Sequence, residues 1–194
     1  MKVFGLTGGV GMGKSTAAQL LSEQGVALVD TDDLAREVVQ PGQPALVEVR
    51  KTFGNDIIGP DGRLLREELA RVVFADPAAR KKLETILHPR IRDLWRARLE
   101  SWRNLGELRA VVVIPLLYET SAEAEFDAVI CVACTPATQR QRLLARGWSL
   151  EELEQRIAAQ MPVAQKMARA DYVVWTEGGL DVHEQQLLRI IPRR

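Results

Sequence analysis

Short apolar segments rich in β-branched residues alternate along the chain with segments of helical periodicity. None of the apolar segments alternates polar with apolar positions, which is typical of strands covered on both faces. Strands that alternate with helices predict a parallel sheet of βαβ units, and hence an α/β fold. The five expected strands are Lys2–Leu6, Val26–Val29, Ala110–Ile114, Ala128–Val132 and Tyr172–Trp175.

The first expected strand runs into a turn at Thr7–Gly13 and then a helix at Lys14–Gln24. Ala17, Leu20 and Leu21 share one face of this helix, and Gly25 is its stop signal. The start of the chain is therefore predicted to be a strand, a glycine-rich turn and a helix.

Between Leu34 and Leu105 no strand-like run exceeds a few residues, and about 70 residues is too long for a plain crossover. We expect a helical insertion at about 34–105, in which an acceptor substrate could bind. We expect a single domain over residues 1–194. Outside the insertion it consists of a core (1–33, 106–135 and 170–194) and a second helical stretch at about 136–169. Turn signals punctuate the insertion at Pro41-Gly42, Gly59–Gly62, Asp76-Pro77 and His88-Pro89.

The composition is that of an ordinary globular protein, 46% hydrophobic and 27% charged. Lys+Arg and Asp+Glu are both 26, which argues against nucleic acid or a membrane surface as a partner held by a basic field. No run approaches the ~20 apolar residues of a membrane span, and no signal peptide is recognised, so a cytoplasmic protein is expected. We expect a monomer or a weak homo-oligomer.

The two cysteines, Cys131 and Cys134, have C-x-x-C spacing. A redox motif needs its first cysteine exposed at a helix N-terminus. Because Cys131 lies within an apolar run, we interpret both as small buried hydrophobic residues.

The segment Gly8–Ser15 matches G-x-x-x-x-G-K-[ST] in full, between an expected strand and an expected helix. Glycines allow positive φ and let backbone N–H groups approach phosphates closely, and the helix N-terminus adds a positive dipole. Lys14 is placed to reach the β- and γ-phosphates, and Ser15 to ligate Mg²⁺. The motif predicts binding of a nucleoside triphosphate, but not the reaction.

Three observations favour a small-molecule kinase. The guanine-specifying N-K-x-D is absent, and Asp56–Gly59 matches D-x-x-G without a preceding strand, so a GTPase is not indicated. Motor and transporter ATPases need a longer chain. The helical insertion and the Arg-rich stretch after Pro136 suit an acceptor site and a phosphate-binding lid.

Asp32, just after the second expected strand, is the candidate catalytic base. Capping of the next helix by Asp30–Asp33 is the alternative. Arg142 and Arg146 share a helix face and could stabilise charge on the transferred group, or else be solvated or paired with Glu151 and Glu152.

The third expected strand ends at Val113 and Ile114 without a carboxylate, so no Walker B acid is evident. Asp32 with phosphate oxygens, or water, would then complete the magnesium shell. Glu119 is a candidate to form hydrogen bonds with the ligands of that ion. His88 precedes Pro89, and either contacts a ligand or packs at a helix boundary.

The chain resembles the dephospho-CoA kinase family over residues 6–171. The resemblance rests on segments in family-like order and spacing: Leu6–Thr16, Val29–Asp32 with Ala35-Arg36, Pro41-Gly42, Phe53-Gly54, Leu87–Pro89, Ile114–Glu119, Arg142 with Arg146, Gln160 and Ala170-Asp171. It implies a P-loop NTPase, adenylate-kinase-like three-layer αβα fold with a helical acceptor-binding insertion and a helical lid. It also implies ATP-dependent phosphorylation of the 3′-hydroxyl of dephospho-CoA, with ATP and Mg²⁺ bound.

The motif and the resemblance together predict that Asp32, Lys14 and Arg142 are catalytic and that Ser15 is the protein ligand of the metal. The nucleotide site comprises Gly8, Gly9, Val10, Gly11, Met12, Gly13, Lys14, Ser15, Thr16 and Arg146. The acceptor site comprises Asp32, Arg36, His88, Leu117 and Glu119. Met12 departs from a position that is commonly small, so its side chain must point away from the phosphates.

Two other functions remain open from the sequence. One is a P-loop kinase of another acceptor, such as a nucleoside monophosphate or a sugar acid. The other is a nucleotide-binding module without transfer activity, which the candidate base Asp32 makes less favoured.

Overall fold

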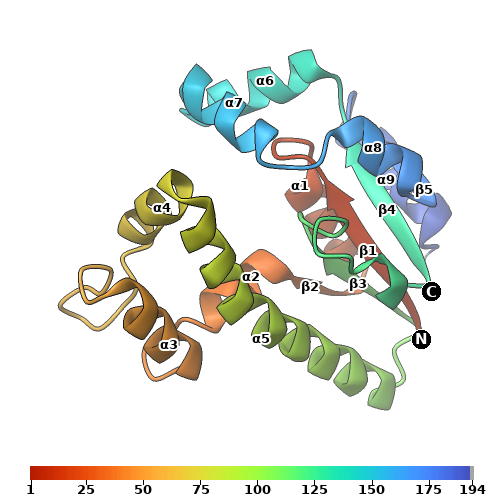
Figure 1. Cartoon of the computed structure of the whole chain (residues 1–194). Coiled ribbons are helices and arrows are strands. Elements are labelled where there is room, and N and C mark those ends of the chain that lie inside the picture. Colours follow the sequence, from red (N-terminus) through yellow and green to blue (C-terminus); the bar gives the residue numbers. More distant parts are fainter. Residues whose placement is uncertain (193–194) are drawn as a thin grey trace. The chain divides into compact units, whose positions relative to one another are not determined.

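The computed structural model of the protein describes residues 1–192, without the side chain of Phe74 (Figure 1). The chain forms two compact units. One comprises Met1–Asp30 together with the described residues from Trp102 onward, and the other comprises Thr31–Ser101.

The first unit is built on a five-stranded parallel sheet with strand order β2-β3-β1-β4-β5. This confirms the predicted α/β class and all five strands, with ends that differ by no more than two residues. The strands are β1 (Lys2–Gly8), β2 (Ala27–Asp30), β3 (Arg109–Val113), β4 (Ala128–Ala133) and β5 (Tyr172–Trp175).

β1 extends further than its apolar pattern indicated. Thr7 and Gly8 pair with Cys131 and Val132 of β4, so the turn predicted to begin at Thr7 begins after Gly8 instead. The hydroxyl of Thr7 donates to the carbonyl of Pro115 at 3.2 Å, which satisfies a polar side chain in a buried strand.

Helices cover both faces of the sheet (Figure 1). On one face, α1 (Lys14–Glu23) and α9 (Leu180–Ile190) bury Leu21 and Leu187 against Phe4 and Leu6 of β1. On the other face, α8 (Val163–Arg169) lies along β4 and β1. The other helical elements of this unit are the short η1 (Glu123–Glu125), α6 (Pro136–Ala145) and α7 (Leu150–Ala158).

β5 is an edge strand, and the expectation of cover on both faces is wrong for it: Tyr172 and Trp175 are 39% and 43% exposed. The side-chain amide of Gln186 in α9 lies on this edge. It accepts from the N–H of Trp175 at 3.0 Å and donates to the carbonyl of the same residue at 2.9 Å. An edge strand leaves backbone N–H and C=O groups on its outer side without a neighbouring strand, and here Gln186 satisfies both groups of Trp175.

The second unit is helical. Its elements are α2 (Thr31–Glu37), α3 (Pro44–Phe53), α4 (Arg66–Ala75) and most of α5 (Pro77–Asn104). Val49, Ile57, Leu69 and Ile86 form one of its cores. None of the helices in residues 1–192 combines the length and hydropathy that a membrane-spanning segment needs.

The helix boundary predicted at His88-Pro89 is wrong, because α5 continues through Pro89 for 28 residues in all. A proline inside a helix costs about 3 kcal/mol, since it lacks an N–H and its ring crowds the preceding turn. Ile86, Trp95 and Leu99 are buried on either side of Pro89. Burial of such side chains stabilises the helix by about 1.5–3 kcal/mol each, enough to offset the proline.

Candidate active site

The glycine-rich loop leaves the carboxyl end of β1, between β3 and β4, where ligands of parallel sheets bind. Gly11 and Gly13 have φ of 74° and 94°, which favours glycine. A Cβ on Gly8 would lie 2.4 Å from the carbonyl oxygen of Val132, and one on Gly11 would lie 2.8 Å from Leu143. The loop therefore follows a path that only glycine allows at these positions.

α1 begins at Lys14, so its N-terminus faces the loop with Ser15 and Thr16 in its first turn. Lys14 Nζ donates to the carbonyls of Gly8 and Gly9 at 2.9 and 3.0 Å, which places the ammonium over the loop. Unpaired helix N–H groups, a positive dipole and a lysine together favour a polyanion. The loop residues have the chemistry that a triphosphate requires.

Met12 is 1% exposed and packs with Ala133, Cys134 and Met167, so its side chain lies in the core. Its peptide group remains part of the loop. The two cysteines are free and buried, and burial raises the pKa of Cys131 to about 11, which confirms their interpretation as buried hydrophobic residues.

Arg142, in α6, is linked to the same loop through Thr176. Its guanidinium donates to the hydroxyl of Thr176 at 2.8 Å and to the carbonyl at 2.5 Å, and that hydroxyl donates to the carbonyl of Met12 at 3.0 Å. Arg146 is exposed and is the C-cap residue of α6. Thr176 was not singled out from the sequence, although a polar residue directly after a strand was a signal for it.

Two glutamine side chains hold Val10. Gln139 Nε2 donates to the Val10 carbonyl at 2.7 Å, and Gln160 Oε1 accepts from the Val10 N–H at 3.0 Å. The sequence marked Gln160 only within the family resemblance and gave no signal for Gln139.

Leu117 and Glu119 lie in the turn that follows β3. Leu117 is fully buried, and a Cβ on Gly5 would lie 2.6 Å from it. Glu119 accepts from the N–H of Met161 at 2.8 Å and pairs with Lys166 Nζ at 2.8 Å. Lys166 is fully buried and was not predicted, because a lysine in an Arg-rich helix has the pattern of a surface residue.

The remaining candidates belong to the helical unit. Asp32 is exposed in the first turn of α2, which begins directly after β2 ends at Asp30. Arg36, on the same helix, pairs with Asp33 at 2.6 Å. His88 is half-buried in α5, and burial and the charge of Arg92 lower its pKa while Glu84 opposes them.

Within residues 1–192 no three His, Cys, Asp or Glu side chains converge as a metal site. Val113 at the end of β3 is buried and apolar. Ser15, in the first turn of α1, is the residue of this loop whose hydroxyl could ligate a magnesium ion.

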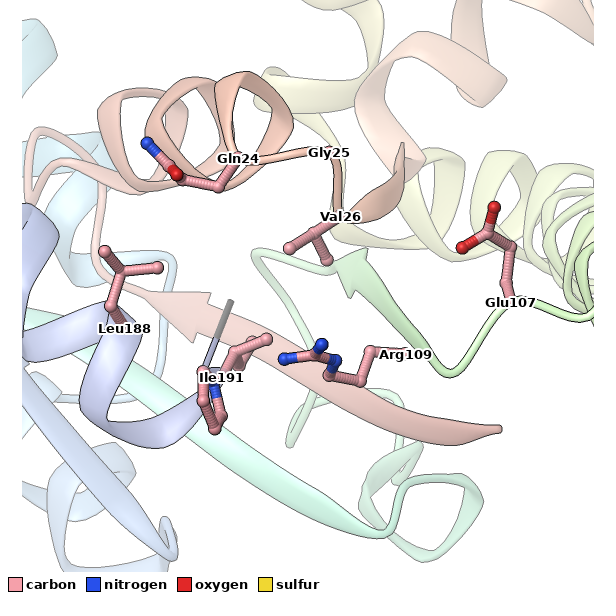
Figure 2. Close-up of a pocket in the computed structure, with 8 residues that line it drawn as sticks. Gln24, Gly25, Val26, Glu107, Arg109, Leu188 and Ile191 are labelled. Atoms are coloured by element: carbon pink, nitrogen blue, oxygen red, sulfur yellow. The ribbon is translucent and has the colours of Figure 1, made fainter. Parts of the chain in front are cut away.

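A small pocket at the opposite, amino-terminal edge of the sheet is lined by Gln24, Val26, Glu107, Arg109 and Ile191, among others (Figure 2). Its cavity volume of about 10 Å³ has room for a single water molecule. Ligands of parallel sheets gather at the carboxyl edge, so this pocket is not part of the candidate site.

A family model described as dephospho-CoA kinase matches residues 2–181. The chain is 48% identical over 179 residues to a dephospho-CoA kinase of Anaeromyxobacter dehalogenans, covering 92% of this chain and 85% of that one. It is 42% identical over 193 residues to a dephospho-CoA kinase of Bdellovibrio bacteriovorus, covering 100% of this chain and 94% of that one.

Solved structures share the fold of this chain. A crystal structure of a Thermus thermophilus protein, 34% identical, superposes with a TM-score of 0.84 over 98% of this chain and 95% of that one. A dephospho-CoA kinase from Campylobacter jejuni, 22% identical, gives 0.72 over 98% and 96%, which shows a shared fold.

Proposed function

Since the chain belongs to the dephospho-CoA kinase family, we infer that it catalyses the ATP-dependent phosphorylation of dephospho-CoA in coenzyme A biosynthesis. We propose that the acceptor atom is the 3′-hydroxyl oxygen. The observation that supports ATP-dependent transfer is the Gly8–Ser15 loop, whose positive-φ glycines and Lys14 have the chemistry to bind a triphosphate at the carboxyl edge of the sheet.

In the proposed step the 3′-oxygen forms a bond to the γ-phosphorus of ATP and the bond from that phosphorus to the bridging oxygen of ADP breaks. The hydroxyl proton passes to the carboxylate of Asp32. β2 lies two strands from β1, so the ends of these strands are about 10 Å apart. Asp32 follows the end of β2 by two residues, which supports its role as the base.

The charge of the transferred group would be stabilised by Lys14 and by the N–H groups of the loop and of Thr16. Arg142 is held by Thr176 at the loop, which supports a role for its guanidinium next to the phosphates. Arg146 is a second candidate contact. Mg²⁺, bound through Ser15, would neutralise phosphate charge and orient the leaving group.

For the acceptor we propose contacts from Arg36 and His88 of the helical unit and from the turn that carries Leu117 and Glu119. Both oxygens of Glu119 accept hydrogen bonds, Oε1 from the N–H of Met161 in the connector after α7 and Oε2 from Nζ of Lys166 in α8. These contacts support a role for Glu119 in holding the shape of the turn.

An acceptor screen tests the activity. Purified protein with ATP and Mg²⁺ is expected to convert dephospho-CoA to coenzyme A with one ADP formed per turnover, and to leave nucleoside monophosphates and sugar acids unchanged. Preference for another acceptor would overturn the substrate, and nucleotide binding without any phosphorylated product would indicate a binding module.

A substitution tests the base. Asp32→Asn is expected to lower kcat by at least about a hundredfold, because a positioned base contributes 10²–10⁴-fold, while ATP affinity stays within a few-fold. Asp61→Asn, at an exposed turn of the same unit, is the control and should leave kcat unchanged. Near-normal turnover of Asp32→Asn would return this residue to helix capping.

A further inference from the structure

The two peptide groups that flank Val10, Gly9–Val10 and Val10–Gly11, are each held by a side-chain amide. The N–H of Val10 donates to Gln160 Oε1 and its carbonyl accepts from Gln139 Nε2, at 3.0 and 2.7 Å. Gln139 is 7% exposed in α6, whereas Gln160 lies in the connector between α7 and α8. Two elements distant in sequence therefore fix the two successive peptide planes on either side of Val10.

Both peptides lie in the glycine-rich part of the loop. Gly8, Gly9, Gly11 and Gly13 surround Val10, and glycine loses more conformational entropy on ordering than any other residue. Ordering one residue costs about 1–2 kcal/mol. A loop that is ordered before the nucleotide binds avoids this cost at binding.

We propose that Gln139 and Gln160 are positioning residues that pre-order the phosphate-binding loop and so set the affinity for nucleotide. The proposal rests on the inferred use of ATP but is independent of the acceptor. A loss of these hydrogen bonds should weaken nucleotide binding, while turnover at saturating ATP changes little.

Both glutamines stand on anchored segments. The N-cap of α6 is Thr135, two residues after β4 ends. Its hydroxyl accepts from the N–H of Thr138 at 3.3 Å. The residue after Gln160, Met161, donates its N–H to Glu119 at 2.8 Å. The connector is thus tied to the loop on one side and to the turn after β3 on the other.

Val10 donates one of the two hydrogen bonds and accepts the other. Substitution of each glutamine by glutamate therefore adds the same charge, but it keeps one hydrogen bond and removes the other. A glutamate at position 160 still offers an acceptor to the Val10 N–H. A glutamate at position 139 has no donor for the Val10 carbonyl and sets a carboxylate against it. Both substitutions add one negative charge beside the loop.

The experiment is calorimetric titration of Mg·ATP and Mg·ADP into the full chain and its variants, with steady-state kinetics alongside. Gln160→Leu is expected to raise the Kd of both nucleotides about tenfold, the effect of one hydrogen bond of ordinary strength. Gln139→Glu is expected to raise Kd at least about tenfold more than Gln160→Glu does. The kcat of each variant should stay within about threefold.

Gln155→Glu, on the exposed side of α7, is the matched control for added charge and should match wild type. Gln139→Met, with an apolar side chain of similar length, replaces Gln139→Glu if that variant does not fold. Equal Kd values for Gln139→Glu and Gln160→Glu, or a wild-type Kd for Gln160→Leu, would overturn the proposal. So would a variant whose melting temperature and kcat fall while its Kd stays unchanged.

Discussion

Lys166 places an ammonium group inside the protein, at the carboxyl edge of the sheet. Its side chain is fully buried, and Nζ donates to the carbonyl of Pro115 at 2.7 Å and pairs with Glu119 at 2.8 Å. We consider the variant Lys166→Met, which keeps the length of the side chain and removes the charge.

Removing one member of a buried ion pair typically costs about 3–5 kcal/mol, because the other charge stays behind without compensation. Glu119 keeps the hydrogen bond from Met161, and its side chain is 22% exposed, so water solvates part of the remaining charge. Pro115 keeps the hydroxyl of Thr7 as a donor. The expected cost is therefore lower, about 2–3 kcal/mol.

The double variant Lys166→Met/Glu119→Gln leaves no buried charge and is expected to lie within about 1 kcal/mol of wild type. Urea unfolding followed by circular dichroism at 222 nm gives each free energy of unfolding. Lys82→Met, at an exposed position of α5, is the control. A cost below about 1 kcal/mol for the single variant, or a double variant as unstable as the sum of both singles, would refute the reasoning.

Two further predictions concern buried titratable groups. The hydroxyl of Tyr118 has no hydrogen-bond partner within residues 1–192, and burial raises its pKa to about 12. Tyr118→Phe should therefore leave the free energy of unfolding unchanged or raise it by up to about 1 kcal/mol. The exposed Tyr172→Phe is its control, and a clear loss would contradict the argument. Burial lowers the pKa of His88 and His183 below 6.5 in the folded state, so the unfolded chain binds more protons as the pH falls through that value. The contribution of the two neutral imidazoles to the free energy of unfolding should be full above about pH 7. It should decline as the pH falls from there through the folded pKa values. Urea unfolding at pH 7.5 and 5.5 should show this decline, and the variant His88→Asn/His183→Asn should show less of it; equal declines would contradict the assignment.

The five strands could be predicted from the sequence because buried parallel strands leave continuous apolar runs, as in Ala128–Ala133. The glycine-rich loop between β1 and α1 could be predicted because its glycines and Lys14 form a contiguous motif. Both patterns lie within short stretches of sequence, so they can be recognised without knowledge of tertiary contacts.

What could not be predicted depends on contacts between distant residues. Pro89 looks like a boundary locally, yet burial along α5 keeps the helix continuous. Lys166 and Gln139 have ordinary helical surroundings, and their importance comes from partners 51 and 129 residues away. Polar side chains that satisfy a distant backbone carbonyl leave no periodicity for a sequence pattern to detect.

The amide of Gln186 at Trp175 has a consequence for behaviour at high concentration. A side chain that occupies both backbone groups of an outer residue takes the place of the first rung that an incoming strand from a second molecule would form. A strand from a second molecule therefore cannot pair with the backbone of Trp175, and an intermolecular β-ladder must begin at another residue.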